Sequence, residues 1–448
     1  MSDSTDTRTY LGDNVSRLNL FGRRKIFINY TAEEINDDNI VEILNDCMLY
    51  HSINSDEIAY LKKYYRGQQP ILNKEKTLRP EINHKVVRNH ALQIVDFHVG
   101  NTFAQPIQYV LTNSKEGGYN ENIADLNRLM NSAFKPTRDR TLGENLVKTG
   151  IAHRYVRSNF KSGLVPFKTS VLNSENTFVA YSNTIDPEPV LGVSYTYKDP
   201  FRNGAGAKVF TAYTKYRTFN VTIGGVGGLG SVKSRANGLK EIPIIEYELN
   251  PSRMGQFEPV ITMMDAINTI ESNRVDGIEQ FVQALLKFKN CEVDEDKLEK
   301  LHELGAIFIK TLKDAANGSE ADVEYMVEEL SQSETQVAVE NLYQQMLNIV
   351  GVPDRQMSAG GNTGQALIIG QGWQSANNVA ESIELMFREP EYLFLNIILK
   401  ILGKSTDEKH RKIVENITLT DINIKFTRSK TFNLLVKTQG LLNLLTAG

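Results

Sequence analysis

The stretch Glu334–Leu402 reads ETQVAVENLYQQMLNIV, then GVPDRQMSAGGNTG, then QALIIGQGWQSANNVAESIELMFREPEYLFLNIILKIL. Apolar residues recur in its first part at three- to five-residue steps, which predicts a helix over 334–350. The middle part, 351–364, is rich in glycine, which tolerates backbone angles that other residues avoid. The last part predicts a second helix over 365–403, kinked where Pro390 removes a backbone donor. We therefore predict a helix, a polar loop and a long kinked helix.

The glycine-rich loop carries no net charge, because Asp354 is offset by Arg355. It has no lysine after its glycines, so it does not match a phosphate-binding loop. Polar loops between helices are often plain surface connections, and that interpretation stays open at this point.

A second glycine-rich segment, Gly225–Gly230, matches the pattern GxGxxG. A dinucleotide site needs a helix directly after this pattern, whereas 231–240 has no helical period. We interpret the segment as a hairpin loop between strands.

Composition sets broad limits. The chain has 448 residues, 41% hydrophobic and 23% charged, with a net charge of −4. The length predicts two to four domains, and the negative charge argues against a protein that simply coats nucleic acid. The two cysteines, Cys47 and Cys291, make neither a disulfide framework nor a zinc site. No signal peptide and no apolar run of membrane-spanning length is present in the sequence, so we expect an intracellular chain with no membrane partner.

The N-terminal half predicts an α/β region. Residues 1–30 are polar and predict a flexible arm. Helices are expected from Thr31, from Asn54 (with Glu57 at capping-box spacing) to Arg66, and over 83–100. The expected strands are 106–111, 165–171, 177–181, 190–197, 208–223 and 242–249.

The C-terminal half begins with the longest helical pattern, Phe257–Asn290, which would extend roughly 50 Å. The following segment, 291–333, has twelve acidic residues against four lysines, a net charge of −8, whereas 60–157 counts to +8. In the acidic segment we expect a helix at 294–304 and strands at 306–312 and 322–327. A strand at 417–426 and an amphipathic segment at 432–445 are expected near the end.

No known catalytic pattern is present. His84, His90 and His98 are spaced six and eight apart, and no HExxH, GxSxG, phosphate-binding or calcium-binding loop occurs. We therefore predict no enzyme, no catalytic residue, no cofactor and no metal site. A site assembled from distant residues stays open.

Four stretches together resemble one protein family. They are YYRGQQPI at 64–71, the segment 83–109 with IVDFHVG, the segment 242–268 with IPIIEY and DAIN, and GVPD followed by GNTGQAL within 351–367. Over about three hundred residues their order and spacing resemble the portal proteins of tailed bacteriophages, specifically the long-tailed siphovirus type of Gram-positive hosts.

The resemblance implies an α+β, predominantly helical portal fold. Its regions would be a wing over 31–255, β-rich at 151–250, a stem helix at 256–290, a clip at 291–333, a second stem helix at 334–350, a tunnel loop at 351–364, a kinked helix at 365–403, and wing or the start of a crown at 404–448. Family members continue into a helical crown, so the crown is expected to be truncated in this sequence.

The resemblance also implies a function: a dodecameric ring at one capsid vertex, assembled in the host cytoplasm. Double-stranded DNA would pass through it without sequence specificity. The terminase large subunit, a head-completion or adaptor protein, and the major capsid and scaffolding proteins would be its partners. The expected DNA-channel residues are Arg355, Gln356, Ser358, Gly360, Gly361, Asn362 and Thr363. The expected docking residues of the clip are Glu295, Glu299 and Glu303.

Two alternatives remain at this stage. Another capsid-associated structural protein, either a minor head or a scaffolding protein, would form shells and not a single ring. A nucleic-acid-processing enzyme would need metal-binding carboxylates around a basic cleft.

Overall fold

The computed structural model describes residues 22–77, 79–112, 120–160, 165–199, 206–224, 231–282, 285–289, 291–292, 310–311, 322–326, 332–354 and 362–428. The chain divides into two compact units. The first comprises Met1–Gln68, Asn89–Thr262 and Gln345–Gly448, and the second comprises Gln69–Arg88 and Met263–Gln344. Both contain helices and strands, which confirms the α+β class.

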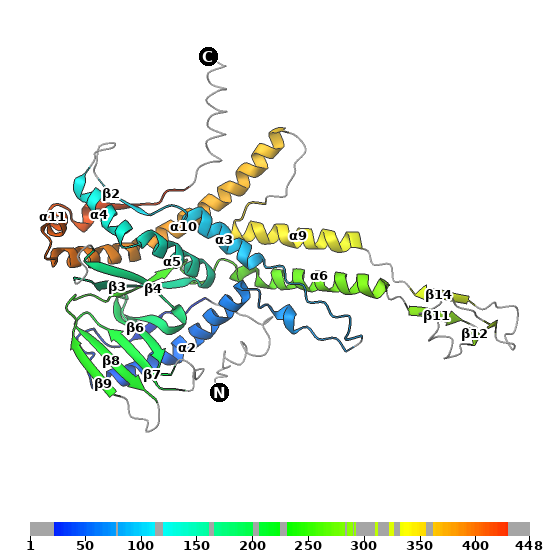
Figure 1. Ribbon diagram of the computed structural model, residues 1–448, viewed down its shortest axis with the longest axis horizontal. Coiled ribbons are helices and arrows are strands. Elements are labelled where there is room, and N and C mark those ends of the chain that lie inside the picture. Colours follow the sequence, from blue (N-terminus) through cyan, green and yellow to red (C-terminus); the bar gives the residue numbers. More distant parts are fainter. Residues whose placement is uncertain are drawn as a thin grey trace, which may run out of the picture. The chain divides into compact units, whose positions relative to one another are not determined.

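A six-stranded sheet in the first unit packs against one long helix (Figure 1). The strand order is β1 (Ile26–Ile28), β5 (Thr177–Ser182), β6 (Pro189–Tyr197), β7 (Lys208–Tyr213), β8 (Arg217–Ile223) and β9 (Ser231–Ala236). Alternate residues of the strands, such as Phe178 and Phe210, are buried with one face of helix α2 (Ile40–Tyr65). The period-two pattern thus gives one apolar face to the sheet, as expected for a half-covered sheet.

Two predictions for the N-terminal region are wrong. Residues 26–28 form a strand parallel to β5, with Ile26 and Ile28 buried, so the flexible arm does not extend to residue 30. One helix, α2, replaces the two that were expected. Asn54 caps nothing, because its side chain accepts from the backbone N–H of Arg24 and donates to the carbonyl of Arg24, at 2.9 Å each.

The GxGxxG segment lies between β8 and β9, which pair antiparallel from Arg217 with Ala236 to Thr222 with Ser231. A strand therefore follows the motif, and the expectation that no helix does so is confirmed. Residues 225–230 themselves lie outside the described part of the chain. The expected strand at 208–223 is a hairpin of β7 and β8.

The remaining elements of the first unit surround a second sheet of three strands, in the order β10 (Ile244–Glu248), β3 (Ile151–Ser158) and β4 (Phe167–Leu172). A two-stranded sheet pairs β2 (Gln108–Leu111) with β15 (Ile422–Lys425). The helices are α3 (His90–Thr102), α4 (Glu121–Ser132), α5 (Lys135–Thr149), α10 (Asn362–Gly403) and α11 (Glu408–Asn416). Helix α10 is continuous through Pro390 and changes direction along its length in Figure 1. Helices α4, α5 and α11 were not predicted.

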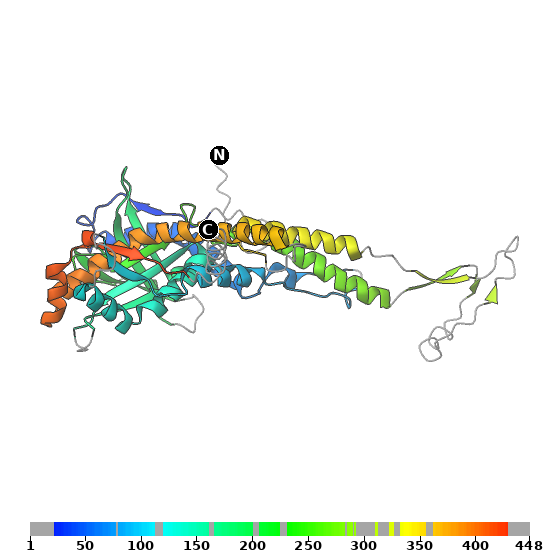
Figure 2. The ribbon, with the colours of Figure 1, turned by 90° about the horizontal axis from the view of Figure 1, so that it is seen from above.

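The second unit contains most of helices α6 (Ile261–Val282) and α9 (Gln332–Val350), which run alongside each other (Figure 1, Figure 2). The predicted helix to Asn290 is wrong, because β11 (Leu285–Lys289) follows Val282 and pairs antiparallel with β14 (Asp322–Met326). The segment from 285 to 289 fits both the helical and the strand period, and a distant partner strand decides between them. The helix is thus about 33 Å long. Short strands β12 (Cys291–Glu292) and β13 (Lys310–Thr311) also pair.

The strand predicted at 322–327 is confirmed by β14, whereas only Lys310–Thr311 of the strand predicted at 306–312 is described as a strand. The helix predicted at 294–304 and the segment at 432–445 lie outside the described residues.

An extended strap, residues 83–89, runs along α6 where a helix from 83 was predicted. The backbone N–H groups of His84, Val86 and Arg88 donate to Asp276 Oδ1 (2.6 Å), Ser272 Oγ (2.9 Å) and Asn268 Oδ1 (2.8 Å). Two residues of extended chain advance about 6.6 Å, and four residues of helix advance about 6 Å. The strap and one stripe of α6 are therefore in register. These N–H groups bond to side chains and not to carbonyls four residues earlier, which is why the segment is not helical.

Candidate functional site

The site predicted from the sequence is the loop between α9 and α10, and the structure describes its two ends. Residues 351–354 and the helix from Asn362 are described, whereas Arg355, Gln356, Ser358, Gly360 and Gly361 lie outside the described residues. Asn362 and Thr363 are the first residues of α10 and not part of a loop, which corrects the expected boundary. Glycine at 364 suggested a later start, but asparagine and threonine commonly begin helices.

The chain leaves α9 through a closed turn at Gly351. The backbone N–H of Val352 donates to Leu347 O (2.9 Å) and that of Gly351 donates to Asn348 O (3.3 Å), the two bonds of a Schellman motif. Gly351 has φ +67°, and a Cβ there would lie 2.8 Å from Val379 Cγ2 of α10. Only glycine fits this position, so the predicted helix end at Gly351 is confirmed.

Helix α3 holds the end of α9 from another direction. The carbonyl of Val350 accepts from His98 Nε2 (2.8 Å) and from Gln256 Nε2 (3.1 Å). His98 is fully buried, and burial lowers its pKa to about 4, although the bond to Val350 acts in the opposite direction. A carbonyl can only accept, so Nε2 carries the proton, and Nδ1 has no hydrogen-bond partner among the described residues.

The same helix also contacts α10. The ring of Phe97 lies 5.9 Å from that of Trp373, and Asn101 Nδ2 lies 3.4 Å from the carbonyl oxygen of Ala376. We refer to this arrangement of α3, the end of α9 and the facing part of α10 as the loop frame. The frame fixes both helices that flank residues 355–361.

Further along α10, the residue after Pro390 is the centre of a buried ionic cluster, the Glu391 cluster. Its six members come from β2, α5, β3, β10 and α10: Tyr109, Lys135, Asp139, Arg154, Tyr247 and Glu391. Glu391 accepts from Tyr109 Oη (2.5 Å) and Tyr247 Oη (2.9 Å), and Lys135 Nζ lies 2.8 Å from it. Burial raises the pKa of Glu391, but the charges of Lys135 and Arg154 outweigh burial and lower it below its usual value. Two carboxylates balance two cations, so the cluster is neutral as a whole.

Sequence analysis missed the residues that build this frame. His98 stood out only as one of seven histidines, although Ile94, Val95 and Val99 around it mark a buried helix face. Glu391 lies at helical spacing from Phe387, Phe394 and Ile398, a signal that a carboxylate points into the core. Glu295, Glu299 and Glu303 of the predicted docking segment lie outside the described residues.

Within the described part of the chain, no cluster of three His, Cys, Asp or Glu side chains has the geometry to hold a metal ion. Among the helices described, none combines the length and the apolar composition that a membrane crossing requires.

Comparison with protein families gives one match of long extent. A family model described as "Phage portal protein, SPP1 Gp6-like" matches residues 50–448. No curated protein matches the chain.

Proposed function

Because the chain belongs to the SPP1 Gp6-like family of phage portal proteins, a structural and not an enzymatic family, we propose that it forms a dodecameric ring at one vertex of the capsid. Double-stranded DNA passes through this ring during packaging and ejection. The observation that carries the proposal is the family match over residues 50–448, which includes the loop, both flanking helices and the strands of the first unit except β1.

The loop frame supports a role for residues 355–361 at the channel. The end of α9 before this segment is fixed by the Schellman turn at Gly351 and by the bonds to Val350 O, and α10 after it is held through Trp373 and the carbonyl of Ala376. The segment between is RQMSAGG, in which small residues predominate and the charge of Arg355 is offset by Asp354. Each phosphate–cation contact adds to DNA affinity, and a ring repeats every contact in each subunit. A neutral loop on fixed ends would touch moving DNA without holding it.

We assign the other regions in the same way. The wing is 31–255, the stem helices are α6 and α9, and the kinked helix is α10. The clip is the acidic segment between α6 and α9, in which Glu295, Glu299 and Glu303 dock the terminase large subunit and then the head-completion protein. Acidic surfaces favour basic partners through complementary potentials. Major capsid and scaffolding proteins are further partners of the ring, which is assembled in the host cytoplasm and lies at one capsid vertex of the virion.

Native mass spectrometry and negative-stain microscopy of the purified chain test the assembly. We expect closed rings of twelve subunits, and exclusively monomers over a range of salt and protein concentrations would contradict the ring. Closed shells would instead favour the alternative of a scaffolding or other capsid protein. Divalent-metal-dependent DNA cleavage would favour the alternative of an enzyme.

A charge added to the loop tests its position. Ser358→Lys adds one phosphate contact per subunit, and it leaves α10, which begins at Asn362, unchanged. We expect slower packaging and ejection, with DNA retention that weakens as salt increases. Thr196→Lys adds the same charge at an exposed position of β6 and is the matched control. Equal packaged DNA per particle in both variants, with rings intact, would contradict the DNA-facing loop alone.

A further inference from the structure

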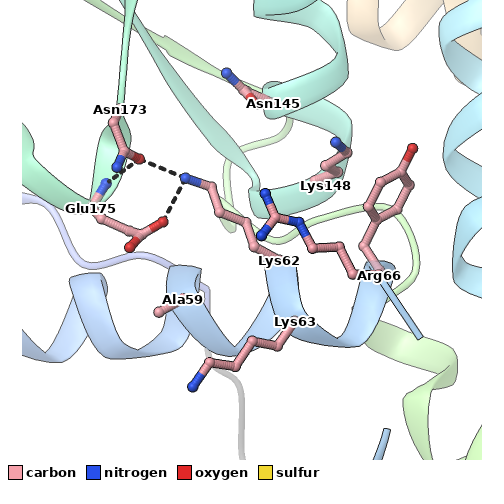
Figure 3. Close-up of a pocket in the computed structure, with 9 residues that line it drawn as sticks. Ala59, Lys62, Lys63, Arg66, Asn145, Lys148, Asn173 and Glu175 are labelled. Carbon is pink, nitrogen blue, oxygen red and sulfur yellow. Dashed lines mark hydrogen bonds and ion pairs between the residues drawn. The ribbon is translucent and has the colours of Figure 1, made fainter. Parts of the chain in front are cut away.

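A polar pocket of about 350 Å³ lies in the first unit between the end of α2, the end of α5 and the short helix η3 (Ser174–Asn176) (Figure 3). It lies among residues that the loop frame and the Glu391 cluster do not use. The lining residues are Ala59, Lys62, Lys63, Tyr65, Arg66, Asn145, Lys148, Asn173 and Glu175. Four of these nine side chains are cationic and one is acidic.

The cations of the pocket differ in how they are compensated. Lys62 Nζ lies 2.7 Å from Glu175 Oε1 and also donates to Asn173 Oδ1. Lys148 pairs with Glu144 one turn earlier, and its Nζ lies 3.8 Å from the centre of the Tyr65 ring. The guanidinium of Arg66 makes no ion pair or hydrogen bond with any residue that the structure describes. Figure 3 shows it between the ammonium groups of Lys62 and Lys148.

The side chains of these cations are not needed to hydrogen-bond the last carbonyl groups of α2. The carbonyls of Lys62, Lys63 and Tyr64 accept from the backbone N–H groups of Arg66 (3.2 Å), Gln68 (3.0 Å) and Gly67 (3.0 Å). The carbonyl of Tyr65 accepts from Asn89 Nδ2 at 2.8 Å. Because the last four carbonyls of the helix are already satisfied, the donors of Arg66 remain available to a ligand.

We propose that this pocket binds a phosphate group. The charged groups of Lys62, Arg66 and Lys148 face the same space in Figure 3, and set against Glu175 and Glu144 they leave a charge of +1. A phosphate monoester carries about −1.5 to −2 at neutral pH, whereas a carboxylate carries −1. The planar fork of Arg66 matches two phosphate oxygens, and the ammonium groups of Lys62 and Lys148 and the amide of Asn145 surround the same space. These donors exceed what the two oxygens of a carboxylate can accept.

The phosphate has two possible sources, the DNA backbone and a free phosphate or nucleotide. Only the DNA source rests on the proposed function. Inorganic phosphate binding is therefore measured first, by calorimetry on the full-length protein in whatever assembly state it adopts, at constant ionic strength, with acetate as the carboxylate probe. We expect saturable phosphate binding at least tenfold tighter than acetate binding.

Three variants test whether the pocket is the binding site. Arg66→Gln should weaken phosphate binding at least tenfold, and Arg66→Lys should restore only part of it because the fork is lost. Arg128→Gln removes an exposed arginine of α4 that pairs with Asp125, and should leave binding unchanged. Equal phosphate affinity of Arg66→Gln and Arg128→Gln would overturn the proposal, as would acetate binding as tight as phosphate binding.

A fluorescent duplex of thirty base pairs then identifies the source. If Arg66→Gln weakens duplex binding and lowers the slope of log affinity against log salt by about one per bound pocket, the source is the DNA backbone. If phosphate binding depends on Arg66 and duplex binding does not, the source is a free phosphate or nucleotide, and the pocket stands independently of the DNA channel. Absence of rings in native mass spectrometry would contradict the proposed function without affecting the phosphate titration.

Discussion

The carboxylates of Glu391 and Asp276 each form ion pairs with two cationic side chains, but the two sets of ion pairs differ in how exposed they are to solvent. In the first unit the side chains of Glu391 and Lys135 are 0% and 1% exposed, and the cluster is closed by tyrosine hydroxyls. In the second unit Lys74 and Lys76 both lie 2.8 Å from Asp276 Oδ2, yet their side chains are 15% and 29% exposed.

This difference in burial predicts that the contacts of Glu391 break only on global unfolding, whereas the contacts of Asp276 can break by local unfolding. Charges in a low-dielectric interior interact strongly, and each depends on its partners because no water replaces them. Partly exposed pairs contribute less and are screened by salt. The Glu391 cluster therefore fixes α10 to β2, α5, β3 and β10. The ion pairs of Asp276 instead join Lys74 and Lys76, just before the strap, to α6, and the strap itself bonds to Asp276 through the N–H of His84.

The largest expected effect is the removal of Glu391. Glu391→Ala leaves Lys135 and Arg154 buried with Asp139 alone, so we expect the free energy of unfolding to fall by about 3–5 kcal/mol. Urea denaturation measures it. Glu389→Ala, at an exposed position two residues earlier, is the control and should change stability by less than about 0.5 kcal/mol. Similar losses in the two variants would mean that the buried cluster does not fix α10.

The second effect concerns His98, which is buried as a neutral group. Its folded pKa of about 4 lies below the unfolded value near 6.5, so the unfolded chain binds more protons between these values. The stabilisation is complete above pH 6.5 and is lost as pH falls towards 4. Between pH 7 and pH 5 the loss attributable to His98 should be about 2 kcal/mol.

Urea denaturation of His98→Gln at both pH values isolates this contribution. The variant should lose about 2 kcal/mol less on acidification than the parent does, because glutamine does not titrate. His90→Gln, in the first turn of the same helix, is the matched control. His51, whose pKa burial also lowers to about 4, titrates in the parent and both variants and cancels from the comparison. An unchanged pH dependence in His98→Gln would contradict a buried neutral histidine.

The secondary structure of the two units shows what the sequence could and could not predict. Local patterns placed α9 and α10 within three residues of their observed ends, because each presents a long apolar stripe and the Gly351 turn ends α9. Local patterns failed where a distant partner decides. Val86 and Val87 fit a helix, but the N–H of Val86 bonds to Ser272, and Leu285 and Phe288 fit a helix, but β11 pairs with β14.

Buried polar residues were the harder part of the prediction. Lys135 and Arg154 contributed to a basic region in the charge count, yet both are fully buried opposite Asp139 and Glu391. A charge count treats every ionisable residue as exposed, and the compensating carboxylates are up to 256 residues away in the chain. Lys62, Lys63 and Arg66, which line the pocket of the further inference, belong to the same basic region, but the count over 60–157 did not single them out.

The smallest effect is expected at the strap. Burial raises the pKa of Asp276, but hydrogen bonds from Lys74, Lys76 and the N–H of His84 outweigh burial and lower it. Asp276→Asn keeps an acceptor for that N–H and removes both ion pairs, so the cost should be only about 1 kcal/mol. This cost is local, and we expect amide hydrogen exchange at Val86 and its neighbours in the strap to accelerate by about fivefold while the first unit is unchanged.

Salt and pH sharpen the contrast with Glu391. In the parent, raising the salt concentration to about 1 M should accelerate exchange in the strap, because it screens the partly exposed Lys74 and Lys76, and should leave the Glu391 cluster unaffected. Asp276→Asn should show no such salt response. The contribution of Asp276 is complete above the unfolded Asp pKa near 3.9 and is lost as pH falls through the lowered folded value. Glu75→Gln removes an exposed carboxylate that takes no part in the ion pairs of Asp276, and it is the control. If amide exchange in the parent strap did not depend on salt, the ion pairs of Asp276 would be as insensitive to screening as the buried Glu391 cluster, and the contrast would fail.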